Sequence, residues 1–410
     1  MPGPKFRFIH AADLHLDTPF AALGRVAPEI AGRLRDASLE AFDALVRMAL
    51  ERRATFVIFA GDIYDSADRG VRAQLRFLRG VERLGEQGIT VFVAHGNHDP
   101  MDGWSAVRRM PENLVVFGAD AVKMHTIGLG DEPWAYVYGI SYPRRVVTEN
   151  LALRFERRAA RGLHIGVLHA NVGNQPEHPA YSPCTVADLA AAGMDYWALG
   201  HIHQYQLLAE GRPWIVYPGS LQAVKSSEIG PRGAVVVDVS GDAVQSVEFV
   251  ALDRVRFARV DVDITGQPDL RSLQKTILAS AVSETTDLLL TVTLTGRGPL
   301  HRDLRRPGTL DELLRDLREE LGIASPFVWV DRIADRTGAE LDREAIARRG
   351  DFSSQLVRLS NDLRAKPQAI EELMSEVWWP AARFEMDDPE SLLLEAEERA
   401  LDLLEGEPEK

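Results

Sequence analysis

The 410-residue sequence has one cysteine and lacks any long apolar run. The lone cysteine, Cys184, cannot form an internal disulfide, so nothing in the composition points to an oxidising compartment. No stretch approaches the roughly 18 apolar residues that a membrane-spanning helix needs. Residues 1–5 lead into a strand pattern rather than a signal peptide. We therefore expect a cytoplasmic protein without a membrane segment.

The sequence also lacks an excess of positive charge. Its net charge is −14, which argues against a protein that coats nucleic acid through a uniformly basic surface. Residues 361–410 hold fifteen Asp or Glu against five Lys or Arg, so −10 of this charge lies in the C-terminal segment. Hydrophobic residues make up 45% of the sequence, and a chain of this length is expected to form two or three domains.

Hydrophobic periodicity predicts the order of the elements. Short apolar strands are expected at 6–10, 55–60 and 89–94, with helices between them at 27–53 and 71–84. Uniformly apolar strands that alternate with helices predict a sheet covered on both faces. The sequence up to residue 252 is then mainly β, which favours a second sheet packed on the first.

We therefore expect an α/β fold with three parts. Residues 1–253 would form a two-sheet sandwich flanked by helices, and residues 254–341 a small α/β capping domain. Residues 342–410 would form a helical, acidic C-terminal segment suited to binding a partner.

Polar residues that can bind metals stand at the ends of the predicted strands. They are Asp13, His15, Asp62, Asn97, His98, His169, His201 and His203. In-line attack on a phosphodiester is helped by two cations about 3.5–4 Å apart, held by carboxylate and amide oxygens and by imidazoles. Gly-Asp and Gly-Asn also occur in ordinary turns, but turns do not require histidines at the same strand ends. The pattern predicts a two-metal phosphoesterase site, with Asp62 as the bridging carboxylate and His98 left to act on the substrate.

This ordered set of motifs resembles the calcineurin-like metallophosphoesterase superfamily. Segments 8–17 and 61–65 are similar to its DNA-repair exonuclease branch, which contains SbcD-like and YhaO-like nucleases. The resemblance implies a metallophosphoesterase sandwich with a cap domain, and two divalent metal ions with manganese as the usual activating ion. It assigns one metal to Asp13, His15, Asp62 and His203, the other to Asp62, Asn97, His169 and His201, and the catalytic role to His98. Asp65 stands where some members carry a further histidine, so the role of this position is open.

The function implied by this resemblance is that of a nuclease subunit in an SbcCD-like DNA repair complex, hydrolysing DNA with a metal-activated hydroxide. The alternative is a phosphatase or phosphodiesterase for a small-molecule or protein substrate, and a third reading is a catalytically silent binding subunit. Serine/threonine phosphatases of the superfamily carry Gly-Asn-His-Glu followed closely by a phosphate-binding arginine. Here Pro100 and Met101 follow Asp99, which favours the nuclease.

A cluster of arginines offers a surface for DNA. Arg154, Arg157, Arg158 and Arg161 have the spacing of one helix face, and Thr148 would cap the helix. These side chains would either grip DNA phosphates or form an ordinary solvated face.

The C-terminal segment predicts a second surface. A helix over 391–404 would carry an apolar stripe, with the aromatic residues Trp378 and Trp379 upstream. The stripe consists of Leu392, Leu393, Ala396, Ala400, Leu403 and Leu404. It would either pack on the chain itself or dock onto the coiled-coil base of an SbcC-like ATPase. The resemblance also implies a homodimer, because members of the branch commonly dimerise.

Overall fold

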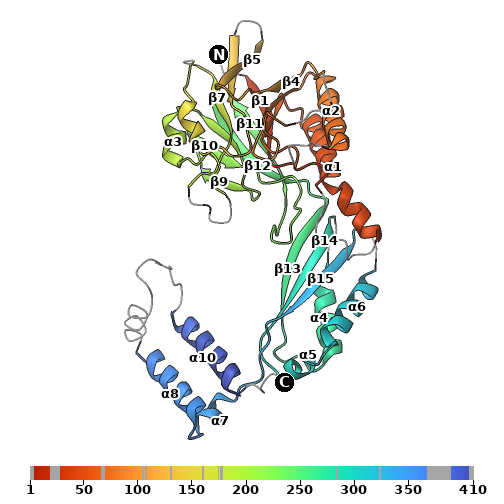
Figure 1. Cartoon of the computed structure of the whole chain (residues 1–410), viewed down its shortest axis with the longest axis vertical. Helices are drawn as coiled ribbons and strands as arrows, with labels where there is room; N and C mark the ends of the chain where they lie inside the picture. The colour runs from red at the N-terminus through yellow and green to blue at the C-terminus, as the bar shows by residue number, and fades with distance from the viewer. Residues whose placement is uncertain are drawn as a thin grey trace. The chain divides into compact units, whose positions relative to one another are not determined.

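The computed structural model describes residues 4–18, 28–65, 70–103, 106, 109–129, 132–158, 161–173, 175, 179–282, 285–322, 325–366 and 389–405. The chain divides into two compact units, and Figure 1 traces both along the sequence. The first contains residues 1–258, 283–289 and 323–328, and the second contains 259–282, 290–322 and 329–410. The domain boundaries expected at 253/254 and 341/342 remain predictions.

The first unit contains two six-stranded sheets. The first sheet has the order β12-β11-β1-β2-β3-β4, in which β1 to β4 are parallel and β11 pairs antiparallel with β1 and β12. Its strands are β1 (Lys5–Ala11), β2 (Phe56–Ala60), β3 (Thr90–Ala94), β4 (Leu114–Val116), β11 (Gly233–Ser240) and β12 (Ala243–Ala251). Helices α1 (Pro28–Glu51) and α2 (Val71–Gly85) connect the first three strands, as the periodicity predicted.

The second sheet has the order β5-β6-β7-β8-β10-β9. Strands β6, β7, β8 and β10 are parallel, and β5 and β9 are antiparallel edge strands. The bounds are β5 (Lys123–Leu129), β6 (Glu132–Gly139), β7 (Leu163–His169), β8 (Tyr196–Gly200), β9 (Gln206–Ala209) and β10 (Trp214–Tyr217). The short helices η1 (Leu151–Arg154) and α3 (Val186–Ala191) contribute to the hydrophobic cluster on the outer face of this sheet.

Alternate residues of β2 face two layers of the core. Val57 and Phe59 pack with residues of α1 and α2 on one face. Phe56, Ile58 and Ala60 pack against the second sheet on the other face. All five are fully buried, which explains why this strand is apolar at every position. Two packed sheets flanked by helices confirm the expected sandwich.

The second unit contains most of a three-stranded sheet of order β13-β14-β15 and a group of C-terminal helices. The strands are β13 (Val255–Asp263), β14 (Asp287–Thr295) and β15 (Val328–Asp335), with helices α4 (Leu270–Ser280), α5 (Leu300–Leu304) and α6 (Thr309–Leu321). Helices α7 (Arg343–Ala347), α8 (Phe352–Arg364) and α10 (Pro389–Glu405) share a small core of Ile346, Val357 and Leu401. Across the described parts of the chain, no helix has both the length and the apolar character needed to cross a membrane.

The packed face of α10 differs from the predicted apolar stripe. Leu401 is fully buried, and so is Glu397, to which Arg343 donates two hydrogen bonds of 2.7 and 2.8 Å. Leu403 and Leu404 of the predicted stripe are exposed. The expected helix is therefore present, but it packs through Leu401 and through Glu397, which pairs with Arg343, rather than through the predicted stripe. Trp378, Trp379 and the side chain of Leu392 lie outside the described residues.

Candidate two-metal site

All eight predicted metal and catalytic residues lie at the carboxyl ends of parallel strands in the first unit. Asp13 and His15 follow β1, Asp62 follows β2, Asn97 and His98 follow β3, His169 ends β7, and His201 and His203 follow β8. A hydrogen bond of 3.0 Å from the backbone N–H of His201 to Asp13 Oδ2 joins the ends of the two sheets. The site thus occupies the position where parallel sheets commonly bind ligands.

The backbone at this edge has an unusual conformation. Asp13, His15, Asp62 and His201 have positive φ angles of 51°, 42°, 50° and 107°. Each such residue costs on the order of 1–3 kcal/mol and tends to occur at functional sites. The loops after β1 and β2 hold one another in place, because the N–H of Asp13 donates to the carbonyl of Gly61 at 3.0 Å and that of His15 to the carbonyl of Asp62 at 3.1 Å.

Two motif glycines permit close packing around the site. A Cβ atom at Gly96 would collide with the carboxylate of Asp62, and one at Gly61 would collide with the ring of His169. Glycine is therefore needed at both positions because the side chains of Asp62 and His169 leave no room for a Cβ atom, whether or not the turn itself requires glycine.

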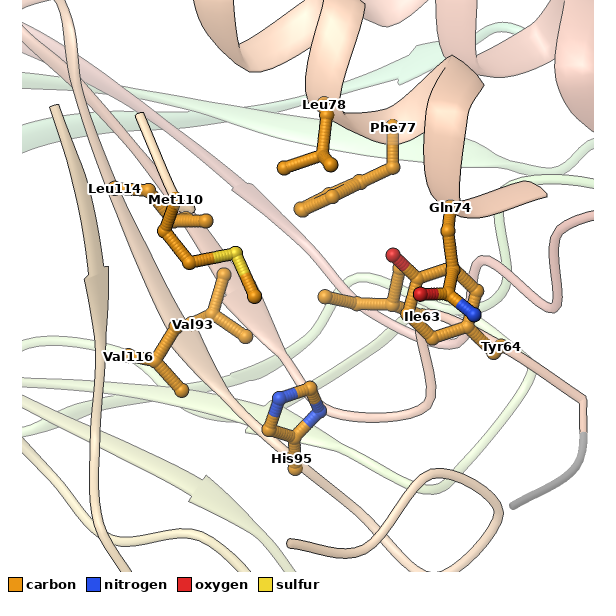
Figure 2. Close-up of a pocket in the computed structure, with 10 residues that line it drawn as sticks. All are labelled: Ile63, Tyr64, Gln74, Phe77, Leu78, Val93, His95, Met110, Leu114 and Val116. Carbon is orange, nitrogen blue, oxygen red and sulfur yellow. The ribbon is translucent and has the colours of Figure 1, made fainter. Parts of the chain in front are cut away.

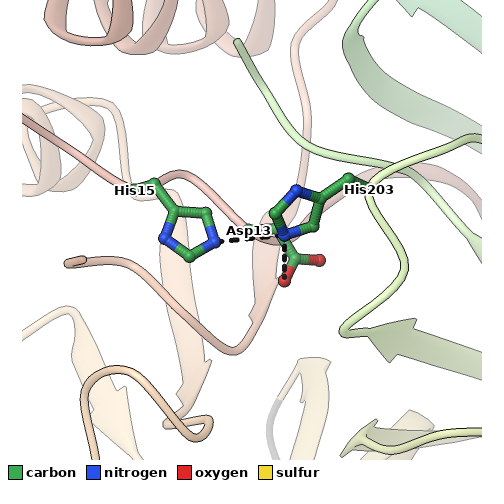
Figure 3. A group of neighbouring side chains, drawn as sticks. All are labelled: Asp13, His15 and His203. Carbon is green, nitrogen blue, oxygen red and sulfur yellow. Dashed lines mark hydrogen bonds and ion pairs between the residues drawn. The ribbon is translucent and has the colours of Figure 1, made fainter. Parts of the chain in front are cut away.

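Asp13, His15 and His203 form the first donor cluster, shown in Figure 3. The Nε2 atoms of His15 and His203 lie 3.3 Å apart, and His203 Nε2 lies 3.9 Å from Asp13 Oδ1. The Nδ1 atom of His203 donates to Glu228 Oε1 at 2.6 Å, and that of His15 faces Asp65 Oδ1 at 3.2 Å. With the ring protons on Nδ1, two Nε2 lone pairs face each other.

Two facing lone pairs repel each other unless a proton or a metal ion lies between them. Metal–nitrogen bonds of about 2.1 Å at right or tetrahedral angles place two ligating nitrogens about 3.0–3.4 Å apart. The 3.3 Å separation of the two Nε2 atoms fits this geometry. The residues at this cluster therefore suit a divalent ion bound by imidazole nitrogen and carboxylate oxygen.

Asp13, Asp62 and His169 form the second donor cluster, and Asn97 and His201 lie beside His169. His169 Nε2 lies 2.9 Å from Asn97 Oδ1 and 3.4 Å from Asp62 Oδ2, and Nδ1 donates to the carbonyl of Ala60 at 3.0 Å. His201 Nε2 donates to the carbonyl of Pro179 at 3.0 Å, so Nδ1 carries the lone pair in the neutral ring. An amide oxygen, a carboxylate oxygen and an imidazole nitrogen thus meet at His169 Nε2.

Asp62 lies between the two clusters. Its Oδ2 atom is 3.4 Å from His169 Nε2 and 4.0 Å from His15 Nε2. Its Oδ1 atom accepts a hydrogen bond of 2.8 Å from the backbone N–H of His98. The carboxylate is buried and fixed on one side, while its other oxygen is directed at both clusters. This is the placement that a bridging ligand requires.

The protonation of the site also indicates a need for positive charge. Burial raises the pKa of Asp62, but the charge and hydrogen bond of His169 outweigh it and hold the pKa well below its usual range. Burial lowers the pKa of His169, but Asp62 raises it more, to about 9. Burial raises the pKa of Asp13 despite the nearby imidazoles. The buried carboxylate of Asp62 therefore favours a positive charge beside it.

His98 lies beside the clusters but is less enclosed. Its Nδ1 atom donates to the carbonyl of Asp65 at 2.8 Å, and its ring centre lies 4.9 Å from that of His15. One third of its side chain is exposed, whereas His15 and His169 are buried. The ring is thus held in orientation and remains reachable from solvent.

Two supporting carboxylates complete the site. Asp99 is buried and accepts 2.9 Å hydrogen bonds from the N–H groups of Gly96 and Ile63, which ties the loops after β2 and β3 together. Glu228 accepts from His203 and has its pKa held at about 2 because that contact and two backbone N–H groups outweigh its burial. Sequence reasoning missed Glu228, because it lies 25 residues beyond His203 in no motif.

The structure does not bring the predicted arginines to the site. The expected helix is wrong, because among residues 151–158 only 151–154 are helical and 155–158 lie in neither a helix nor a strand. Arg154 donates to Glu149 at 2.6 Å, and Arg157 donates to Asp195 at 3.1 Å. Asp195 precedes β8, so Arg157 lies at the opposite end of the strand from His201. Exposed side chains remain at Arg158 and Arg161, and their role in DNA binding stays a prediction.

A small apolar hollow lies on the α2 side of the same loops, as Figure 2 shows. It is lined by Ile63, Tyr64, Gln74, Phe77, Leu78, Val93, His95, Met110, Leu114 and Val116. None of the candidate metal ligands contributes to this lining. The hollow is therefore separate from the two clusters.

Comparison with known proteins agrees with the fold and the donor set. Residues 6–205 match the model of the calcineurin-like phosphoesterases, and residues 257–338 match the middle domain of the metallophosphoesterase YhaO. The chain belongs to the calcineurin-like phosphoesterase family, whose fold binds divalent metals.

Its relatives identify the branch. Over 337 residues the chain is 34% identical to the uncharacterized metallophosphoesterase YhaO of Bacillus subtilis, covering 81% of this chain and 82% of that one. It is 28% identical over 276 residues to the DNA double-strand break repair protein Mre11 of Aeropyrum pernix, covering 63% and 64%. It is 25% identical over 260 residues to Mre11 of Sulfurisphaera tokodaii, covering 61% and 63%. The chain thus spans less than two thirds of the length of these Mre11 proteins. These relatives belong to the DNA-repair branch that the motifs predicted.

Proposed function

We propose that the chain is a phosphodiesterase that uses two divalent metal ions, most simply Mn²⁺, and that its substrate is DNA. The observation that carries this proposal is a pair of adjoining donor clusters, Asp13–His15–His203 and Asp13–Asp62–His169, with Asp62 Oδ2 lying 3.4 Å from His169 Nε2 and 4.0 Å from His15 Nε2. One ion would be held by Asp13, His15, Asp62 and His203, and the other by Asp62, Asn97, His169 and His201. When bound, such ions supply Lewis acidity toward a phosphate and a nucleophile at neutral pH.

His98 would protonate the leaving oxygen. Its Nδ1 proton is engaged by the carbonyl of Asp65 at 2.8 Å, so Nε2 is the nitrogen that can carry a second proton to the substrate. As the bond between phosphorus and the leaving oxygen breaks, the Nε2 proton moves to that oxygen and the ring becomes neutral. The exposure of the ring is consistent with contact to a polymeric substrate.

Three observations support DNA over a small phosphoester. Two relatives carry the name DNA double-strand break repair protein, and the similarity to them covers 63% and 61% of this chain. Pro100 and Met101 follow Asp99, where the superfamily's serine/threonine phosphatases place a phosphate-binding arginine. The partly exposed His98 also leaves the site open to an extended strand.

The test compares two substrates in the presence of Mn²⁺. Purified chain is incubated with end-labelled duplex DNA and, separately, with a chromogenic phosphodiester, and a His98→Ala variant controls for contaminating nucleases. We expect both substrates to be cleaved and both activities to fall together in the variant. Cleavage of the small ester alone would favour a small-molecule phosphodiesterase and contradict the nuclease assignment.

We further propose that an SbcC-like coiled-coil ATPase docks on α8 and α10. These helices expose Phe352, Leu359 and Leu403 by 67%, 57% and 86%, and large exposed apolar side chains often mark a partner surface. Within the second unit α10 is anchored by Arg297, which donates to Asp402 at 2.8 and 2.6 Å. Deleting α10 would therefore damage this unit as well as remove a docking surface.

Point variants separate these effects. A Leu359→Glu, Leu403→Glu double variant should lose co-purification with an SbcC-like ATPase and keep its hydrolysis of the small ester. Arg399→Gln, an exposed change on the same helix, serves as the matched control. Retained co-purification in the double variant would exclude this surface.

A further inference from the structure

Glu228 joins a metal-ligand candidate to a neighbouring loop. Its side chain is 11% exposed, and its Oε1 atom accepts the Nδ1 proton of His203 at 2.6 Å. Its Oε2 atom accepts from the backbone N–H groups of Val224 and Lys225 at 2.8 and 3.2 Å. Each carboxylate oxygen therefore has its own partner, and rotation of the carboxylate would break both sets of bonds.

The loop that carries Glu228 is itself fixed at its far end. Ile229 forms a bridge with Phe257, and the N–H of Gly230 donates to the carbonyl of Phe257 at 3.0 Å. Arg232, which is buried, lies close enough to interact electrostatically with Glu228. Because the loop is held by these contacts, Glu228 presents its Oε1 atom to His203 from a defined direction.

This contact sets the chemistry of His203. A ring whose proton resides on Nδ1 presents the Nε2 lone pair, and His203 Nε2 is the atom that faces His15 and Asp13 at 3.3 and 3.9 Å. A carboxylate acceptor also makes the imidazole a stronger donor to a metal than a neutral acceptor would. By contrast, His169 in the other cluster donates its Nδ1 proton to a carbonyl, that of Ala60.

We propose that Glu228 is a positioning residue, which holds His203 in the tautomer and orientation that bind the ion of the first cluster. This inference rests on the proposed two-metal function and adds a determinant that acts on one ion. The hydrogen bonds that the structure gives Glu228 go to His203, Val224 and Lys225, and none of these residues belongs to the second cluster. Loss of Glu228 should therefore weaken the binding of one ion more than that of the other.

The experiment measures Mn²⁺ binding and the His203 tautomer in the full chain. The variants are Glu228→Gln, which keeps the side-chain volume, and Glu228→Ala, with the exposed change Glu210→Gln as control. Calorimetric titration should show one Mn²⁺ site weakened by about 10- to 100-fold in both Glu228 variants and the other little changed. Long-range ¹H–¹⁵N spectra of the metal-free chain should show the Nδ1–H form of His203 in the wild type and its loss in Glu228→Ala.

A double-mutant cycle separates positioning from general stabilisation. In a His203→Ala background, Glu228→Ala should cause no further loss of Mn²⁺ affinity, because the ring through which it acts is gone. An unchanged tautomer, unchanged affinity in both Glu228 variants, or equal weakening of both sites would overturn the proposal. Failure of the two-metal function itself would look different, since the wild-type chain would then bind fewer than two Mn²⁺ ions.

Discussion

Metal binding at the second cluster should release a proton, because His169 is protonated in the metal-free chain. Burial lowers the pKa of this imidazole, but the buried Asp62 beside it raises the pKa to about 9. The protonated atom, Nε2, is the one that lies 2.9 Å from Asn97 Oδ1 and 3.4 Å from Asp62 Oδ2. A metal ion that takes these three ligands must displace that proton.

The size of the effect follows from this pKa. Each pKa unit corresponds to about 1.36 kcal/mol, so at pH 7 a pKa of about 9 opposes binding by about 2.7 kcal/mol, or about 100-fold in apparent affinity. The apparent affinity for Mn²⁺ should therefore rise about tenfold per pH unit from pH 7 toward 9. His15, whose pKa is also raised because Asp65, Asp62 and Asp13 outweigh its burial, would steepen this dependence.

The stability of the metal-free fold should change in the opposite direction. The pKa of His169 is higher in the folded chain than its ordinary value of 6.5, so the bound proton stabilises the fold fully below pH 6.5. This stabilisation is lost as the pH rises through about 9. Metal-free protein should thus unfold more easily at pH 8.5 than at pH 6.5, while added Mn²⁺ should protect it more at the higher pH.

Calorimetry in two buffers with different ionisation enthalpies measures the released protons directly. We expect about one proton or more per chain at pH 7 and a pH-dependent affinity between pH 6.5 and 8.5. His125→Gln, a change on the exposed edge strand β5, should leave the proton count unchanged. An affinity that does not vary with pH, together with no proton release, would refute the reasoning.

Four further changes test separate parts of the account. Asp62→Asn should lose both Mn²⁺ ions and its activity. The loss of Mn²⁺ affinity should be far larger than the roughly 10- to 100-fold loss expected when a supporting contact is removed. If the variant still bound two ions, Asp62 would be excluded as the bridge. His98→Ala should abolish hydrolysis yet keep both ions, whereas lost Mn²⁺ would make it a ligand. His10, buried between Tyr196 and a backbone carbonyl, has a pKa lowered from 6.5 to about 3 by burial, so the fold should lose about 2 kcal/mol between pH 7 and 5. A His10→Gln variant that kept the same loss in a urea titration would contradict this. Arg157→Gln should cost roughly 1–3 kcal/mol in the free energy of unfolding, because it removes a partner of the buried Asp195, and should leave the salt dependence of DNA binding unchanged. A flatter salt dependence in this variant would show that Arg157 contacts DNA.

The site could be predicted from the sequence because its ligands follow strands that are buried on both faces. In β2 every residue is buried, so the apolar run marks the strand and the first polar residue after it marks the strand end. Parallel strands then bring their ends together, which is why Asp13, Asp62 and Asn97 meet despite their separation along the chain. The positive φ angles that aim Asp13 and Asp62 have no comparable local signal, because they depend on hydrogen bonds between two loops.

The features that sequence reasoning missed depend on contacts between distant residues. Arg157 fits a helical spacing, yet it lies outside any helix and donates to Asp195, 38 positions away. The periodicity of α10 is correct, but the buried pair of Arg343 and Glu397, 54 positions apart, decides which side packs. Glu228 contacts His203 because of the conformation of its loop, which no local sequence pattern predicts. Hydrophobic periodicity predicts where helices and strands begin and end. Ion pairs between distant residues decide which side of such an element is buried, and periodicity does not predict them.

The central claim is that two metal ions share Asp62 between the clusters. A crystal of the full chain grown with Mn²⁺, with data collected at the manganese absorption edge, tests it most directly. The account predicts two anomalous peaks about 3.5–4 Å apart, one bordered by His15 and His203, the other by Asn97 and His169, with Asp62 between them. A single peak, or two peaks that do not share Asp62, would contradict it.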